Sequence, residues 1–270
     1  MNALVAGYAI MSAMFTVTPQ LFLPWLTAVA AVVPLVILER WIHKHLQGVG
    51  LLITNDPETA VILYYFVMLP GVIVHEFGHW VMATLLRVRI RKIRIWPERQ
   101  RGGTIRLGLV QTDKVDPVRS TLIGLGPLVA GVAVVLFVST RILNTGPFYA
   151  ALATGDLPTI LAGIDGLTGT PDFWIWTYVL FAVSNAMMPS AADRQSWPVV
   201  GLGIALVVGA MFLMDLGNLV ALGLQQVALA AEAVTVAFLT AIGVDLVFVV
   251  VIFLLEEVLG RIFGRVIDYK

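Results

Sequence analysis

The sequence contains no cysteine and few charged residues. Without cysteine, disulfide bonds and thiolate zinc sites are excluded, so any metal ion must be bound by His, Asp or Glu. Charged residues make up only 13% of the 270 residues, and 17 Lys and Arg residues balance 17 Asp and Glu residues. A net charge of zero gives no indication of a nucleic-acid partner.

Long polar segments are missing as well, so we expect no separate soluble domain within these residues. Hydrophobic residues make up 59% of the chain, and the mean hydropathy is +0.92. These values are typical of a multi-pass integral membrane protein, which has the lipid bilayer as its surroundings. No basic segment precedes the apolar stretch that begins at Ala3, so we do not expect a cleaved signal peptide.

Apolar runs predict an all-α fold with about six or seven transmembrane helices. Residues 3–41 could form two spans, over 3–17 and 22–41, or one long kinked span, and the membrane side of the N-terminus stays open with them. We expect His43-Lys44-His45 to lie at a solvated, interfacial end of this region. The later spans are expected over 61–86, 121–143, 173–188, 199–222 and 233–257.

Short motifs predict where one helix begins and how another packs. Asn55 or Asp56 is expected to cap the 61–86 helix, with Pro57 in its first turn. The small residues of segment 124–127, Gly-Leu-Gly-Pro, allow a close approach between helices in lipid. A short interfacial helix is expected over 157–167.

The segment 87–119 is strongly basic and contains ten of the 17 Lys and Arg residues. The positive-inside rule places this loop in the cytoplasm, together with the basic C-terminus. A basic loop beside a membrane is a commoner arrangement than a nucleic-acid site.

Within this loop, apolar and basic residues alternate over 88–95, and the alternation returns over 104–110. The pattern predicts a small β-hairpin on the membrane surface. An exposed edge of this hairpin could pair with an extended substrate peptide. The apolar residues expected at that edge are Ile105, Leu107 and Leu109.

The 61–86 run contains the motif His75-Glu76-Phe77-Gly78-His79. Residues four apart share one face of a helix, so His75 and His79 can bind one metal ion. Glu76 lies beside them, where it can exchange a proton with a water molecule at the metal. H-E-x-x-H on a helix is the pattern of zinc hydrolases, and ionisable residues in lipid favour a function. The alternative is a pair of buried histidines that hydrogen-bond to backbone carbonyls.

A catalytic zinc site needs a third protein ligand and an open position. Pro189 should break the 173–188 span, which returns to the same membrane side as the two histidines. Asp193 follows it and is the best third ligand by this depth argument. It could instead be a solvated acid beside Arg194, and Asp215 and Asp245 are competitors.

Together these residues resemble the site-2 protease family of intramembrane zinc metalloproteases. In that family the first helix of a three-helix core carries H-E-x-x-H, and the third carries N-x-x-P-x-x-x-x-D-G. Asn185 and Asp193 keep the family's spacing, whereas Pro189 stands one position late and Arg194 replaces the usual Gly. The resemblance covers roughly residues 61–200.

The resemblance implies a zinc metalloendopeptidase that cuts peptide bonds in or near transmembrane segments of membrane-protein substrates. His75, His79 and Asp193 would bind one Zn²⁺ per chain, and Glu76 would be the catalytic base. Asn185 would lie near the substrate or the oxyanion of the reaction. Many relatives carry PDZ-like or CBS-like modules, which are not visible in this sequence, and the oligomeric state stays open.

The chain would then divide into three parts. Residues 1–60 are N-terminal membrane segments and an outer loop, 61–200 the catalytic core with its hairpin loop, and 201–270 the C-terminal transmembrane helices. Two rival functions stay open: a zinc-handling transporter, to which Asp245 would belong, and an inert relative that binds membrane proteins. The clustering of the metal residues at one depth disfavours the first, and the intact Glu76 disfavours the second.

Overall fold

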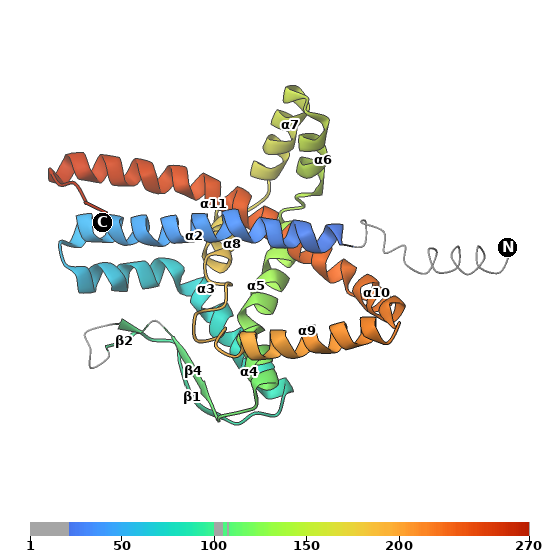
Figure 1. The fold of residues 1–270 in the computed structure, drawn as a ribbon. Coiled ribbons are helices and arrows are strands. Elements are labelled where there is room, and N and C mark those ends of the chain that lie inside the picture. Colours follow the sequence, from blue (N-terminus) through green and yellow to red (C-terminus); the bar gives the residue numbers. More distant parts are fainter. Residues whose placement is uncertain (1–21, 100–104, 107, 270) are drawn as a thin grey trace.

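The computed structural model of the chain describes residues 22–99, 105–106 and 108–269. Helices dominate it, and a small antiparallel hairpin accompanies them (Figure 1). Four helical stretches are long and apolar enough to cross a membrane, which indicates an integral membrane protein. They are α2 (Leu23–Thr54), α3 (Pro57–Leu85), the stretch Pro117–Ile142 and α11 (Ala228–Phe263). The number of six or seven spans and their orientation stay predictions.

The third stretch and the shorter helices differ in detail from the predicted spans. The helix predicted over 157–167 is confirmed as α7, whereas the single span predicted over 199–222 is wrong. A break separates α9 from α10, and in it Asp215 adopts a left-handed conformation (φ 61°) that a helix does not accommodate. The bounds are α4 (Pro117–Gly124), α5 (Gly126–Phe137), η2 (Val138–Ile142), α6 (Gly146–Thr154), α7 (Leu157–Thr168), α8 (Phe173–Ser184), α9 (Trp197–Leu213) and α10 (Gly217–Gln226).

Helix α2 extends further than the sequence predicted. The expected 3–17 span lies outside the described residues. From Leu23 the helix continues through Pro34 to Thr54, so His43 and His45 lie within it. Their location at the membrane interface stays a prediction. Packing explains this length, because α2 lies between α3 and α11 and contacts both (Figure 1).

A tight turn joins α2 to α3. Asn55 ends α2 in the left-handed conformation (φ 54°), and Asp56 caps α3, since its carboxylate accepts a hydrogen bond of 2.8 Å from the backbone N–H of Thr59. Pro57 stands at the start of α3, where its missing N–H costs nothing. Of the two predicted capping residues, Asp56 is therefore the one that caps the helix.

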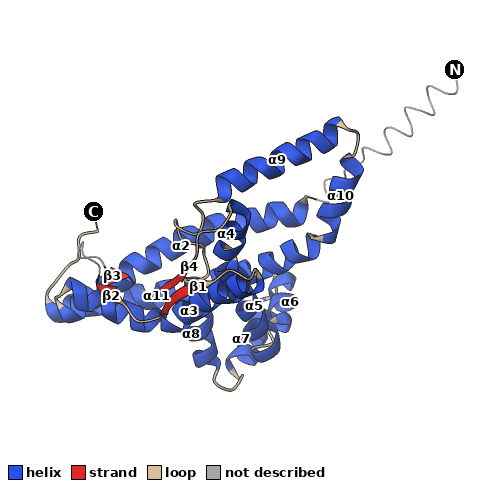
Figure 2. Cartoon of the chain, turned by 90° about the horizontal axis from the view of Figure 1, so that it is seen from below, coloured by secondary structure: helices blue, strands red, loops and turns tan. Residues whose placement is uncertain are grey.

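The basic segment forms the predicted β-hairpin. Strand β1 (Ile90–Arg94) pairs antiparallel with β4 (Leu109–Thr112), and β2 (Glu98–Arg99) pairs with β3 (Ile105–Arg106). Leu107 lies outside the described residues, as do the side chains of β3. The hairpin lies against α3, since the Tyr65 hydroxyl donates a hydrogen bond of 2.7 Å to the carbonyl of Ile95 (Figure 2).

Glycines let the central helices meet backbone to backbone. A Cβ atom on Gly78 of α3 would meet the carbonyl group of Gly126 of α5, and one on Gly126 would meet the carbonyl of Gly78. Gly71 of α3 lies in the same way against the carbonyl of Ala182 in α8. The close approach predicted for segment 124–127 is thus confirmed.

One apolar core joins these helices to the flanking ones. It contains buried side chains from α2, α5, α8 and α11, among them Leu35, Val135, Leu180 and Phe238. Helix α9, by contrast, has no buried residue among those described and lies apart from the main helices (Figure 2). Val74 of α3 packs against this core, which therefore holds α3, the carrier of His75 and His79, beside α8, after which Asp193 follows.

Candidate metal centre

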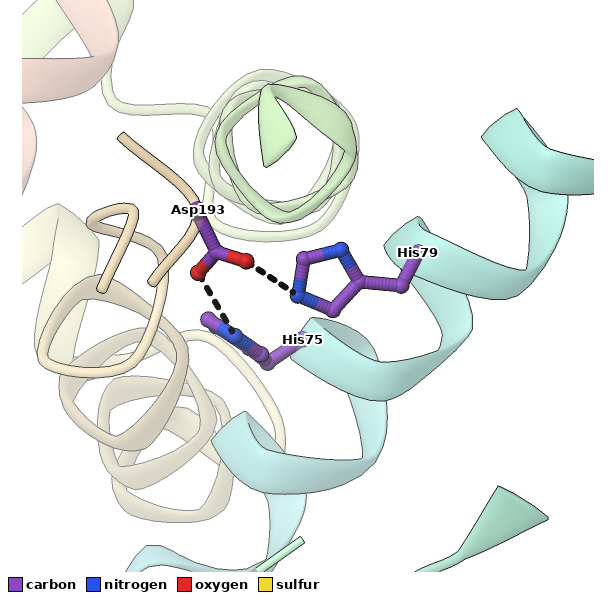
Figure 3. Close-up of side chains that lie close together, drawn as sticks. All are labelled: His75, His79 and Asp193. Atoms are coloured by element: carbon purple, nitrogen blue, oxygen red, sulfur yellow. Dashed lines mark ion pairs between the residues drawn. The ribbon is translucent and has the colours of Figure 1, made fainter. Parts of the chain in front are cut away.

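The structure brings His75, His79 and Asp193 together (Figure 3). One potential ligand atom from each lies within 4.8 Å of the others. The Nε2 atom of His79 is 3.3 Å from Oδ1 of Asp193, and Nε2 of His75 is 3.9 Å from Oδ2. No other group of three His, Cys, Asp or Glu side chains within 22–99 and 108–269 meets this distance.

Backbone carbonyls orient both imidazole rings. Nδ1 of His75 lies 2.6 Å from the carbonyl oxygen of Ala186, and Nδ1 of His79 lies 3.0 Å from that of Ile123. A carbonyl oxygen can only accept, so each Nδ1 must carry the hydrogen atom. In the neutral rings each Nε2 then has its lone pair directed toward the other members of the group. This arrangement is usual for histidines that bind a metal.

The loop after α8 places Asp193. Helix α8 ends at Ser184, four residues earlier than predicted, and the chain is irregular up to α9. Within this loop the backbone N–H and the hydroxyl of Ser190 donate hydrogen bonds of 2.8 and 2.6 Å to Oδ2 of Asp193. Gly124 lies so close to the backbone carbonyl of Asp193 that a Cβ atom would collide with it. A glycine on α4 is therefore a requirement for this loop position.

Glu76 lies next to the group and is buried, with 8% of its surface exposed. A Cβ atom on Gly108, which precedes β4, would lie 3.0 Å from Cδ and 3.1 Å from Cγ of Glu76. The backbone of the hairpin thus covers the Glu76 carboxylate directly. The prediction from sequence missed Gly108, although its lack of a side chain within an alternating strand was a signal of close backbone approach.

Two cavities reach the group formed by His75, His79 and Asp193. The larger, of about 780 Å³, reaches His75, Glu76 and Asn185 and has mostly apolar walls from α2 and α11. The smaller, of about 400 Å³, reaches His79 and Asp193. Its further lining includes the polar side chains of Thr112, Asp113, Lys114 and Ser120. The group is therefore open to an apolar space on one side and to a polar space on the other.

Asn185 lines the larger cavity but is bonded away from the metal group. Its side-chain nitrogen donates to Oδ1 of Asp245 at 2.7 Å and to the carbonyl of Phe181 at 2.9 Å. The main-chain carbonyl oxygen of Asn185 lies 3.1 Å from Nε2 of His43. Prediction from sequence had named no partner for Asp245 and had placed His43 at the interface. No sequence motif around Asp245 or His43 predicts that these residues contact Asn185.

The remaining predicted residues stand as follows. Leu109 is not among the residues that line either cavity, whereas its neighbours Gly108 and Val110 are. Ile105 pairs with Arg99 across the hairpin. Asp215, a competitor for the third ligand position, is exposed in the break between α9 and α10. Asp245, the other competitor, is fully buried and bonded to Asn185.

Comparisons of this chain with protein-family models, with curated proteins and with solved structures found no match. The functional interpretation rests on the residues and their geometry.

Proposed function

We propose that the chain is an intramembrane zinc metalloprotease of the site-2 protease type, which hydrolyses peptide bonds in or near transmembrane segments. The observation that carries the proposal is the convergence of His75 and His79 with Asp193, beside Glu76. The two histidines and Glu76 lie on α3, which is apolar enough to span a membrane, and Asp193 lies in the loop after α8. Regulated intramembrane proteolysis of a membrane-protein substrate is the process in which such an enzyme acts.

The donor set fits zinc. Two imidazole nitrogens and one carboxylate are typical ligands of a catalytic zinc ion, which keeps one further position open. Ligand atoms about 2.0–2.2 Å from a tetrahedral zinc lie roughly 3.3–3.6 Å apart. The separation of 3.3 Å between Nε2 of His79 and Oδ1 of Asp193 lies in this range, and Nε2 of His75 lies 3.9 Å from the other carboxylate oxygen.

Zinc in this site would supply a water molecule of lowered pKa and a Lewis acid for the scissile carbonyl. Glu76 would act as the general base: its carboxylate would take one proton from the attacking water molecule as the water oxygen bonds to the carbonyl carbon. Glu76 then gives this proton to the amide nitrogen as the C–N bond breaks. The products are a carboxylic acid and an amine, and Glu76 returns to its starting form.

The two cavities support this use of the site. An apolar space of about 780 Å³ suits a segment of a transmembrane substrate, since ligand sites commonly measure about 300–1,000 Å³. The polar space next to His79 and Asp193 gives water a route to the metal. Glu76 is buried under the hairpin at the boundary of the larger space.

Metal content of the purified protein is the test. We expect about one zinc per chain, the number a three-ligand site holds, and loss of that zinc in Asp193→Ala. Asp215→Ala is the matched control, because Asp215 is an exposed acid outside the group. A folded native protein that takes up no zinc from a zinc-supplemented buffer would refute the proposal.

Cleavage is then measured in proteoliposomes that contain the purified protein together with a mixture of labelled single-span model membrane proteins. The main rival function is zinc transport, and it gains no support from Asp245. The Asp245 carboxylate accepts hydrogen bonds from Asn185 and Ser184, and it belongs to no group of three potential metal ligands among the described residues.

A further inference from the structure

One face of α2 forms a wall of the larger cavity. The lining residues of this helix recur every three or four positions from Trp25 to His43, which places them on one side of it. The face is about 27 Å long, at 1.5 Å per residue. It is apolar as far as Val36 and then presents Glu39 and Arg40. A ligand in this cavity therefore meets an apolar stretch that is followed by charged groups.

Arg194 joins Arg40 in the charged part of the cavity wall. Both arginines are exposed and line the same cavity. Among the described residues, the Arg40 side chain forms no hydrogen bond or ion pair, and that of Arg194 forms a single hydrogen bond, from Nε to the Ser190 carbonyl at 3.3 Å. A guanidinium group has several N–H donors, so most of these donors remain available to a ligand. An arginine within an apolar helix such as α2 also favours a function.

Glu39 is the acid next to these two arginines. Its charge attracts Arg40 and Arg194, although neither is close enough for a direct ion pair. Glu76, the other acid of the cavity wall, lies beside the metal group. The charged part of the wall thus has two positive charges and one negative charge. A ligand carboxylate would balance them, whereas a ligand ammonium group would add a third positive charge, so the wall favours an acidic group.

We propose that Arg40 and Arg194 determine substrate specificity by binding the carboxylate of an Asp or Glu side chain in the transmembrane segment of the substrate. This inference rests on the proposed function and names its substrate class: a mainly apolar segment with one acidic residue close to the scissile bond. The acid lies close to that bond because Arg194 directly follows Asp193. Guanidinium groups bind carboxylates strongly, and ionisable residues are rare in transmembrane segments, so this contact would select few membrane proteins.

Binding to the Glu76→Gln variant tests the proposal without cleavage. The labelled single-span model proteins carry Asp, Asn or Lys at one position at a time along the apolar segment, and their dissociation constants are measured in mild detergent. At one position we expect Asp to bind about 10- to 100-fold more tightly than Asn, as for one hydrogen bond between charged groups. Lys at that position should bind more weakly than Asn. Equal affinities for Asp and Asn at every position would overturn the inference.

Substitution of the arginines shows whether they cause this preference. Arg40→Gln and Arg194→Gln, each combined with Glu76→Gln, should reduce the preference for Asp over Asn by about 10-fold. Arg40→Glu should reverse it, so that Lys binds more tightly than Asp at the same position, and a merely structural role of Arg40 would not produce this reversal. Zinc content and melting temperature are measured for every variant, because Arg194 is adjacent to Asp193. If one variant does not fold, the other remains decisive.

Arg141→Gln is the matched control, since Arg141 is an exposed arginine of η2 that lines neither cavity. Its preference for Asp should stay within about twofold of the value without this change, because distant exposed charges are screened by salt. A preference for Asp that persists in folded Arg40→Gln and Arg194→Gln would overturn the inference. Affinities that depend on the arginines and on added anionic lipid, but not on the charge of the substrate, would also overturn it, since the arginines would then bind a lipid phosphate.

Cleavage by the native protein separates this inference from the proposed function. We expect kcat/KM to be higher for the Asp form than for the Asn form at the position found by binding. Equal cleavage of the two forms would contradict the inference alone. A zinc-loaded native protein that cleaves none of the model proteins, although Glu76→Gln prefers the Asp form, would instead show that the proposed function is wrong while the charge recognition stands.

Discussion

Gly78→Ala is expected to separate α3 from α5 and to disturb the metal group. The new Cβ atom would lie 2.5 Å from the carbonyl oxygen of Gly126, 2.6 Å from its carbonyl carbon and 2.7 Å from the nitrogen of Pro127. Ordinary contacts of a methyl carbon are about 3.5–4.0 Å. The two backbones must therefore separate by about 1 Å, because neither can rotate out of the way.

The magnitude follows from two opposing effects. Overpacking of this kind costs about 1–3 kcal/mol, and the higher helix propensity of alanine offsets about 1 kcal/mol of it. We expect the free energy of unfolding to fall by roughly 0–2 kcal/mol. The next residue, His79, bonds to Ile123 across the same contact. A shift of about 1 Å at the reacting groups is expected to lower kcat/KM by about 100-fold.

For the native protein and the Gly78→Ala variant in mild detergent, we would measure the free energy of unfolding by denaturation, the zinc content and the cleavage rate. Gly243→Ala on α11 is the matched control, since a Cβ atom there meets nothing within 4 Å. That variant should be as stable as the native protein or slightly more stable. If Gly78→Ala matches Gly243→Ala in both stability and cleavage, the backbone contact does not hold the site together as we infer.

Three further predictions concern the site and a helix cap. Glu76→Gln should keep about one zinc per chain but lose about 10²- to 10⁴-fold in kcat, the usual contribution of a general base; retained cleavage would remove Glu76 from that role. Gly108→Ala should lower kcat without loss of zinc, because its Cβ atom would displace the Glu76 carboxylate; Gly223→Ala, where a Cβ meets nothing within 4 Å, is the control. Side-chain and backbone hydrogen bonds from Thr59 lower the pKa of Asp56 below its usual 3.8. The cap therefore stabilises the native state above about pH 4 and is lost as pH falls through the lowered pKa. Asp56→Asn, which also caps well, should abolish this acid-dependent part of a melting-temperature profile, and an unchanged profile would contradict it.

Local sequence patterns predicted those parts of the protein that depend on near neighbours along the chain. The spacing of His75 and His79 places them on one face of α3, because a helix turns once in 3.6 residues. Alternating residues predicted the hairpin, and Asp56 with Pro57 predicted the start of α3. The membrane-spanning character of four helices followed from their apolar length.

The candidate third ligand was predicted in a different way. Asp193 was chosen by depth and spacing, and the structure brings it to the two histidines. Its location depends on Ser190, which is near it in sequence, but also on the close approach to Gly124, which is not. Membrane depth restricts which residues can meet, and it selected an acid that lies beside the histidines; its role as a metal ligand stays a prediction.

The break between α9 and α10, the full length of α2 and the environment of Asn185 were decided by the tertiary structure. Helix α2 continues past His43 because α3 and α11 cover it, and packing does not appear in the periodicity of α2 alone. By itself, the sequence determined the apolar helices, the hairpin and two potential metal ligands on one helical face, because these depend on local periodicity. Only the tertiary structure decided the tautomers of the histidines, the cover over Glu76 and the direction of the Asn185 amide. Each of these depends on a carbonyl, a glycine backbone or a carboxylate from a distant segment, and such contacts have no local pattern.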